Sequence, residues 1–339
     1  MVSKAMIMAA GVGSRLDPLT QDIPKPLIPI ANRPIMDLLF DRLSDLGIKD
    51  VIANTHYKAE QIIERYKNNS LGINFNHIYE EILSGTAGGV KKCQFFFDEG
   101  QDFLVLSADG LSNANIKAII ESHKNSDAIV TMGVKKIELE EIPKFGVVVT
   151  DENGFVSEFQ EKPAIKDAKS DCINTGIYVF DYEIFNYIPE NTFYDFAKNV
   201  FPQLLSEGRK INTYRVEEYW SDIGTISQYR QSTKDLFDNL YEIKHSAIIK
   251  TSKGSYIKGE NTYMAPTASF YGVNTIGKNC IIGKNVILKD CIILDDVEIY
   301  DNVVLKDCII GSHSEIKVKM FNQVIGANQI ISHGVYTKK

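Results

Sequence analysis

Hydrophobic and polar positions in the first two thirds of the chain follow two alternating periods. Short apolar runs at 5–10, 50–55 and 102–109 predict strands, and the last is continuous enough to be buried on both faces of a parallel sheet. Between them, residues 34–47 carry apolar side chains at helical spacing, and Gly47 marks the end of that helix. Repeated strand–helix units of this kind predict an α/β fold with a Rossmann-like, mixed and mostly parallel sheet.

One segment interrupts this rhythm. Residues 145–163, "FGVVVTDENGFVSEFQEKP", contain two apolar runs that flank a turn ending in Asn153-Gly154. That turn is a hairpin signal, so we expect a β-hairpin that leaves the regular strand–helix order.

From about residue 246 the period changes to steps of six with an occasional five. The nonapeptide "NVILKDCII" (285–293) returns as "NVVLKDCII" (302–310), a displacement of 17 residues. Repeats this short predict a β-solenoid whose coils have three faces. The expected inward positions are Ile276, Ile282, Ile287, Ile293, Ile299, Val304, Ile310 and Ile316, with a second set at Cys280, Val286, Cys291, Val297, Val303 and Cys308. The cysteines in this set are expected to be core filler.

These periods divide the chain into a catalytic-type domain at 1–235, a linker at 236–245 and a solenoid at 246–339. A net charge of −7, without long Lys or Arg blocks, argues against binding to nucleic acid or to a membrane surface. The N-terminus lacks signal-peptide features, and no apolar stretch is long enough to cross a membrane. Five cysteines without CxxC spacing indicate reduced thiols, so we expect a cytoplasmic protein.

The stretch "GVGSRLDPLTQDIPKP" (11–26) has the glycines of a phosphate-binding loop. It is not a Walker A loop, because no Lys follows Gly13, and Leu16 occupies the place of the third glycine of a dinucleotide-binding loop. The glycines alone fit a structural turn equally well. Arg15 and Lys25, the latter between two stiffening prolines, add two positive charges suited to a polyphosphate.

The longer string "MAAGVGSRLDPLTQDIPKPLIPIANRPI" resembles the signature of the sugar-1-phosphate nucleotidylyltransferases, or nucleotide-sugar pyrophosphorylases. Further pieces follow in that family's order: "GTAGGVKK" (85–92), "FLVLSADGL" (103–111), "KFGVVV" (144–149), "FQEKP" (159–163), "INTGIYVF" (173–180) and "YWSDIGTISQY" (219–229). The resemblance covers about residues 5–232. It implies a GT-A-like nucleotidyltransferase fold, and the solenoid matches the left-handed parallel β-helix that many members carry.

The implied reaction joins a hexose 1-phosphate to a nucleoside triphosphate and releases pyrophosphate. The attacking phosphate oxygen is already ionised at neutral pH, so catalysis rests on positioning and charge neutralisation rather than on a general base. By resemblance, Arg15 neutralises the leaving pyrophosphate and Lys25 stabilises the α-phosphate. The residues expected to contact the nucleotide are Ala10, Gly11, Gly13 and Ser14 at the phosphates, and Gly85 and Thr86 at the base.

Asp109 follows the apolar strand at the end where active-site residues of α/β sheets project. The resemblance implies that Asp109, also a catalytic residue, and Asp222 hold Mg²⁺, although either could instead serve a turn or a helix cap. Ala108 departs from the family's usual glycine before this aspartate. Its methyl group could crowd the metal, and Gly110 could relieve that crowding.

For the sugar phosphate, the resemblance implies Gly146, Glu161, Lys162, Asn174 and Thr175. A carboxylate suits sugar hydroxyls and an ammonium suits the 1-phosphate. An exposed ion pair is the plain alternative for the Glu and the Lys.

The sequence as a whole, particularly residues 85–92 and 145–163, resembles those of mannose-1-phosphate guanylyltransferases. Glucose-1-phosphate uridylyl- or thymidylyltransferase is the alternative. Two other readings remain open: an acetyltransferase in the β-helix with His313 or His333 as base, and a regulatory subunit that binds nucleotide sugar without turnover. Retention of both cations and both aspartates argues against the latter. Apolar solenoid faces predict a homo-oligomer through the β-helix.

Overall fold

The computed structural model describes residues 2–244, 247–332 and 335–338. Contacts within the chain group it into two compact units, one made of Met1–Val12 and Leu39–Asp222, the other of Gly13–Leu38 and Ile223–Lys339. The glycine-rich loop is therefore divided between the units after Val12. The sequence boundaries at 235 and 246 stay a prediction.

A nine-stranded mixed sheet forms the centre of the first unit. Its strands are β1 (Lys4–Met8), β4 (Asp50–Thr55), β5 (Asn74–Tyr79), β6 (Phe103–Ser107), β8 (Val130–Lys136), β9 (Gly146–Thr150), β10 (Val156–Glu161), β11 (Cys172–Phe180) and β12 (Ile211–Arg215). The parallel order β6-β1-β4-β5 continues through the antiparallel strand β11, which pairs with both β6 and β8. The predicted mixed, mostly parallel sheet is confirmed, as is the β9–β10 hairpin.

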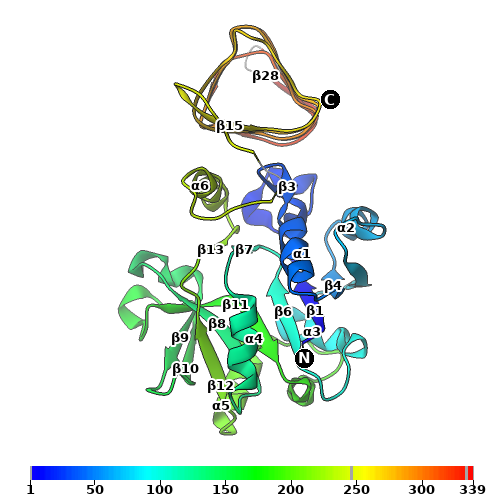
Figure 1. Ribbon diagram of the computed structural model, residues 1–339, viewed down its shortest axis with the longest axis vertical. Coiled ribbons are helices and arrows are strands. Elements are labelled where there is room, and N and C mark those ends of the chain that lie inside the picture. The colour runs from blue at the N-terminus through cyan, green and yellow to red at the C-terminus, as the bar shows by residue number, and fades with distance from the viewer. Residues whose placement is uncertain (1, 245–246, 333–334, 339) are drawn as a thin grey trace. The chain divides into compact units, whose positions relative to one another are not determined.

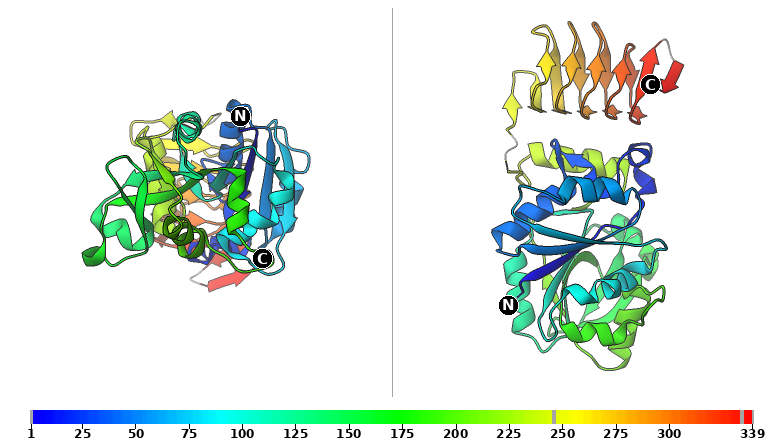
Figure 2. Two further views of the ribbon diagram at one scale, coloured as in Figure 1. Left: turned by 90° about the horizontal axis from the view of Figure 1, so that it is seen from below. Right: turned by 90° about the vertical axis from the view of Figure 1, so that its right-hand side faces the viewer.

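Helices lie on both faces of this sheet (Figure 2). They are α2 (Ala59–Tyr66), α3 (Gly85–Lys92), α4 (Ile116–Lys124) and α5 (Phe201–Ser206), together with α1 (Ile35–Asp45), along which the chain passes from the second unit into the first. Helix α4 begins where the Asn115 side chain accepts a hydrogen bond from the Ala118 amide, an N-cap that satisfies a helical N–H. A fully buried aromatic cluster that includes Phe103, Phe180 and Phe185 stabilises the strand ends.

The sheet is joined by a small antiparallel ribbon of β7 (Gly110–Ser112) and β13 (Trp220–Asp222). Strand β7 begins three residues after β6 ends, so the ribbon starts directly at the edge where the apolar strand stops. This short element positions both aspartates singled out by the sequence.

The second unit contains a parallel β-helix. Figure 1 looks along its axis and shows a triangular cross-section, and Figure 2 shows the coils stacked side by side. Its strands are β14 (Ile249–Lys250), β15 (Gly254–Lys258), β16 (Tyr263–Met264), β17 (Ser269–Ile276), β18 (Ile281–Ile282), β19 (Ile287–Lys289), β20 (Ile292–Ile293), β21 (Glu298–Ile299), β22 (Val304–Lys306), β23 (Ile309–Ile310), β24 (Glu315–Ile316), β25 (Met320–Phe321), β26 (Val324–Ile325), β27 (Gln329–Ser332) and β28 (Val335–Lys338). The strands of successive coils pair in parallel, which confirms the predicted solenoid.

Two of the expected inward positions are wrong. Ile287 is exposed and Val304 is half-buried, whereas Leu288 and Leu305 are completely buried. The inward residues are six positions apart from Ile282 to Leu288 and five apart from Leu288 to Ile293. The prediction placed the step of five before this face instead of after it, and so chose the residue one position too early. A shift of one residue turns a strand side chain to the opposite face. The other six predicted inward residues and the second set, cysteines included, are buried as expected.

Asparagine and aspartate residues with positive φ form the corners of the coils. Asn285 and Asn302, one coil apart, have φ of 56° and 62°, and the side chain of the first donates to that of the second at 3.0 Å. Short amide and carboxylate side chains tolerate the left-handed backbone that these corners need.

One apolar face of the β-helix is covered by the same unit. Ile292 and Ile309 precede inward residues, so strand alternation points them outward, yet both are buried. Helix α6 (Ile226–Phe237) lies against this face, since its Arg230 shares a small hollow with Ile292. No helix in the described part of the chain is long and apolar enough to span a membrane.

Candidate functional site

The two aspartates predicted to hold a metal lie at one end of the β7–β13 ribbon. Asp222 pairs directly with Gly110, the residue after Asp109. The Ser107 hydroxyl at the end of β6 donates to Asp109 Oδ1 at 2.5 Å and thereby orients that carboxylate. The carboxyl end of a parallel strand is the usual ligand-binding edge of an α/β sheet.

The donor chemistry at this edge fits Mg²⁺. Within the described ranges, no group of three or more His, Cys, Asp or Glu side chains is arranged to hold a metal ion. Two carboxylates are what Mg²⁺ takes when water and substrate phosphates complete its coordination, whereas structural zinc needs four protein ligands. Ala108 does not disturb the site by backbone strain, because its φ is not positive and its amide donates to Met8 O at 3.2 Å.

The predicted sugar-phosphate residues on the hairpin form a compact group. Glu161 pairs with Gly146 across β9 and β10, and Lys162 Nζ lies 3.2 Å from Glu161 Oε1. Lys162 has a φ of 49°, a conformation that costs free energy for a residue with a side chain and is often kept at functional sites. A Cβ on Gly146 would lie 2.4 Å from Phe159 Cζ, so the absence of a side chain lets the Phe159 ring pack against this strand.

Asn174 and Thr175 lie on an irregular part of β11 and are held by the protein itself. Asn174 Oδ1 accepts from the Gly176 amide at 3.0 Å, and the Thr175 hydroxyl donates to Gly133 O at 2.7 Å. Trp220 Nε1 on the ribbon donates to Thr175 O at 3.0 Å. The last bond joins β11, which carries the predicted sugar-phosphate residues, to the strand that carries Asp222.

Gly176 lets β11 pass close to Ser107 at the end of β6. Its φ is 74°, and a Cβ there would lie 3.0 Å from Ser107 Cβ, the residue that orients Asp109. The structure thus brings the predicted metal residues and the predicted sugar-phosphate strand together in the first unit. Sequence reasoning missed Ser107 and Trp220, although each lies two residues from a predicted aspartate.

The predicted nucleotide residues of the first unit lie in two main-chain segments, here called strips: one after β1 and one at the start of α3. Ala10 and Gly11 follow β1, and the Cβ position of Gly11 faces open space, which leaves room for a ligand at the backbone. Gly85 opens α3 with a φ of 79°, and a Cβ there would lie 2.4 Å from Tyr194 O. The Thr86 hydroxyl donates to Asp195 Oδ2 at 2.9 Å, so its main chain is what this position offers to a base.

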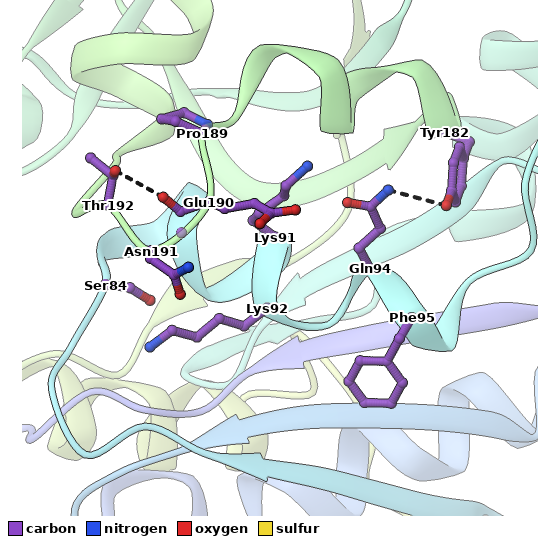
Figure 3. Close-up of a pocket in the computed structure, with 11 residues that line it drawn as sticks. Ser84, Lys91, Lys92, Gln94, Phe95, Tyr182, Pro189, Glu190, Asn191 and Thr192 are labelled. Carbon is purple, nitrogen blue, oxygen red and sulfur yellow. Dashed lines mark hydrogen bonds between the residues drawn. The ribbon is translucent and has the colours of Figure 1, made fainter.

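A cavity of about 460 Å³ lies beside α3 (Figure 3). Helix α3 contributes Lys91 and Lys92, and the segment after Pro189 closes the other side. None of the site residues predicted from the sequence lines it, so its volume does not mark the predicted site.

In the second unit, the remainder of the glycine-rich loop holds both predicted cations. Gly13 has a φ of 73°, and a Cβ there would lie 2.9 Å from Lys25 Cβ, so the lysine stem packs directly against the glycine. Lys25 is buried, while Ser14 and Arg15, in a short 3-10 helix (Ser14–Leu16), are exposed. The Thr20 hydroxyl donates to Gly13 O at 3.0 Å and fixes the turn.

The structure gives little support for a catalytic base among the histidines of the β-helix. The exposed His313 occupies a coil corner with a φ of 60°, and its Nδ1 lies 3.6 Å from Asp296 Oδ2. Exposure and an ion pair of this kind are ordinary surface features. His333 lies outside the described residues.

Comparison with known proteins assigns both parts of the chain. The nucleotidyl transferase family model matches residues 4–239, and the GMPPB C-terminal domain model matches 252–339. A UTP–glucose-1-phosphate uridylyltransferase of Synechocystis sp. is 36% identical, covering 75% of this chain and 68% of its own. A mannose-1-phosphate guanylyltransferase of Mycobacterium tuberculosis is 30% identical, covering 87% and 80%. A solved structure of UDP-glucose pyrophosphorylase with UDP-glucose shares the fold, with a TM-score of 0.62 and 20% identity over 70% of this chain and 99% of the other.

Proposed function

Because this chain belongs to the nucleotidyl transferase family and is a sugar-1-phosphate nucleotidylyltransferase, we propose that it joins mannose 1-phosphate to GTP. The products are GDP-mannose and pyrophosphate. The observation that carries the reaction is the convergence of Asp109, Asp222 and the sugar-phosphate strand at one sheet edge. The choice of mannose and GTP is supported by the C-terminal domain match and by the Mycobacterium relative, whose similarity extends over 87% of this chain.

In the proposed mechanism, an oxygen of the mannose 1-phosphate attacks the α-phosphorus of GTP in line. A P–O bond forms there, and the bond between the α-phosphorus and the bridging oxygen to the β-phosphate breaks. Pyrophosphate leaves with the electron pair. Lys25 stabilises the charge on the α-phosphate and Arg15 that on the leaving pyrophosphate, while the main chain from Ala10 to Ser14 donates N–H groups to the triphosphate.

On the sugar side, the Lys162 ammonium binds the 1-phosphate and the Glu161 carboxylate accepts hydrogen bonds from sugar hydroxyls. Asp109 and Asp222 are the residues that would hold Mg²⁺, which when bound polarises phosphoryl oxygens and neutralises their charge. Ser107 keeps the Asp109 carboxylate in one orientation, which lowers the reorganisation needed for binding.

A second substrate pair, glucose 1-phosphate with UTP, is favoured by the higher identity to the Synechocystis enzyme. Thymidylyl transfer to glucose 1-phosphate is the remaining alternative from the sequence. Base choice depends on a few hydrogen bonds in the pocket, which fold similarity alone does not define.

Pyrophosphate release tests the substrate proposal. Purified protein with Mg²⁺ is given mannose 1-phosphate or glucose 1-phosphate, each with GTP, UTP, dTTP, ATP or CTP. We expect the highest kcat/KM for mannose 1-phosphate with GTP. A dominant glucose 1-phosphate pair overturns the substrate choice but not the reaction. Inactivity of folded protein that binds nucleotide sugar supports a regulatory subunit, and thiol release from acetyl-CoA with glucosamine 1-phosphate supports an acetyltransferase.

We also propose that the protein forms a homo-oligomer through the β-helix. Tyr263 and Ile281, neighbours on successive coils of one face, are both exposed, in contrast to the face that α6 covers. Burying such a face against another copy removes apolar surface from water. Light scattering after size exclusion should give more than one protomer for the wild type and a monomer for Ile281→Lys; a wild-type monomer contradicts this assembly.

A further inference from the structure

A buried carboxylate outside the predicted site lies between the two strips of main chain assigned to the nucleotide. Glu80 follows β5 and is 1% exposed, although it carries a charge. Charged side chains are rarely buried to this degree unless their oxygens are fully used. Its partners show what that carboxylate holds in place.

Hydrogen bonds from both main-chain segments converge on the Glu80 carboxylate. The Ala9 amide donates to Asn54 Oδ1 at 3.0 Å, and Asn54 Nδ2 donates to Glu80 Oε1 at 2.7 Å. Glu80 Oε2 accepts from the Ser84 amide at 3.1 Å, from the Ser84 hydroxyl and from Lys92 Nζ at 3.1 Å. The chain of bonds therefore connects the residue before Ala10 to the residue before Gly85.

Helix α3 packs closely against this link. Asn54 and Ser84 are both buried. A Cβ on Gly89 in α3 would lie 2.6 Å from Asn54 Nδ2 and 3.1 Å from Glu80 Oε1, so the helix closes directly over the pair. Only the Lys92 end reaches the surface, where its side chain extends along the cavity of Figure 3 toward Ser84.

We propose that Glu80 and Asn54 are a positioning pair that holds the main chain of residues 9–11 and 84–86 at a fixed separation for the nucleoside triphosphate. This inference rests on the proposed function, which assigns those two strips to the triphosphate and the base. The pair acts through the backbone and makes no contact with the reacting atoms.

The donor and acceptor pattern supplies a sharp test. In Glu80→Gln, the new side-chain NH₂ group is a donor that must face another donor, either Asn54 Nδ2 or the Ser84 amide. Rotating the Asn54 amide by 180° would give the new NH₂ group an acceptor, but Asn54 Nδ2 would then face the Ala9 N–H. In Asn54→Asp, two carboxylates face each other. In the double variant N54D/E80Q, the new carboxylate at position 54 accepts from both the Ala9 amide and the new side-chain amide at position 80. The oxygen of that side-chain amide accepts from Ser84, so the pattern is complete again.

Affinity for GTP with Mg²⁺, and in parallel for UTP, is measured by calorimetry without a sugar substrate, and KM values are measured by pyrophosphate release. Each single variant should raise the Kd and KM for the nucleotide by about tenfold and leave the KM for the hexose 1-phosphate within about twofold. The double variant should return to within about threefold of the wild type. Asn212→Ala is the matched control, because it removes a buried hydrogen bond to Thr131 and a partly buried one to Ser122, neither of which belongs to a strip.

A single variant that lowers the melting temperature like Asn212→Ala, but leaves nucleotide affinity unchanged, overturns the positioning role. So does a double variant that is no better than its parents. The proposed function fails separately, when the wild type binds nucleotide but turns over no sugar phosphate; the calorimetric comparison then still decides the role of Glu80.

Discussion

Asp222 is the cross-strand partner of Gly110, so a residue late in the first unit lies beside the one that follows Asp109. A ribbon of two three-residue strands is enough to bring the aspartates to the same sheet edge. Trp220 extends this arrangement by its hydrogen bond to Thr175 O on β11. The ribbon therefore couples the carboxylates proposed to hold the metal to the strand that is proposed to receive the sugar phosphate.

Replacement of Lys25 tests the charge proposed at the α-phosphate. Lys25→Met keeps most of the apolar stem that packs against Gly13 but removes the ammonium group. We expect kcat to fall by about 10²–10³, the usual cost of removing one group that stabilises developing charge. The exposed Lys49→Met is the control and should keep wild-type kcat. Equal activity of the two variants would exclude a catalytic role for Lys25.

Gly146→Ala tests the sugar side without replacing a charged residue. The new Cβ would lie 2.4 Å from Phe159 Cζ and 3.2 Å from Glu161 Oε2, so the Phe159 ring or the hairpin must shift. A displacement of this size should lower kcat/KM for the hexose 1-phosphate by about 10–100-fold, with the KM for the nucleotide nearly constant. Ser157→Ala, on the same hairpin but exposed, should change neither constant. A nucleotide KM that rises alone would place the hairpin on the wrong substrate.

The pH dependence of stability should report the hydrogen bonds that Glu80 accepts. Burial acts to raise its pKa, but hydrogen bonds from Ser84, Asn54 and Lys92 outweigh burial and hold the pKa below the usual 4.5. A carboxyl group with a lowered folded-state pKa stabilises the fold above its unfolded pKa, and this contribution is lost as the pH falls through the folded value.

Denaturant unfolding of the wild type and Glu80→Gln should therefore show a constant difference in unfolding free energy from pH 7 to about 5, which shrinks below pH 4.5. A difference that grows as the pH falls would contradict the lowered pKa.

Much of the fold could be predicted because its signals are local. The strand at 50–55 matches its predicted bounds, and its apolar centre at 51–53 is completely buried. Strand β5 was not predicted, because its side chains are mostly exposed at the edge of the sheet and show no apolar pattern. Helix α3 was also missed, since its three glycines disfavour a helix and its contacts with the rest of the unit stabilise it.

The arrangement of the site residues could be predicted less completely from the sequence. Asp109 could be placed at a strand end from the sequence pattern, but its pairing with the Asp222 strand depends on tertiary structure and was suggested only by family resemblance. The solenoid shows a related limit: the period was correct, yet Leu288 rather than Ile287 points inward. Two adjacent apolar residues leave the register undecided until the coils stack.

The most direct test of the account is Mg²⁺-dependent pyrophosphate release by four proteins: wild type, Asp109→Asn, Asp222→Asn and Asp127→Asn. Asp127 is an exposed carboxylate that lies 3.8 Å from Lys210, and its variant is the control for the loss of one negative charge. With saturating mannose 1-phosphate and GTP, both site variants should lose at least about 100-fold in kcat while the control keeps wild-type activity. Folded Asp109→Asn and Asp222→Asn proteins that retain full activity would contradict the role of the paired aspartates in the reaction.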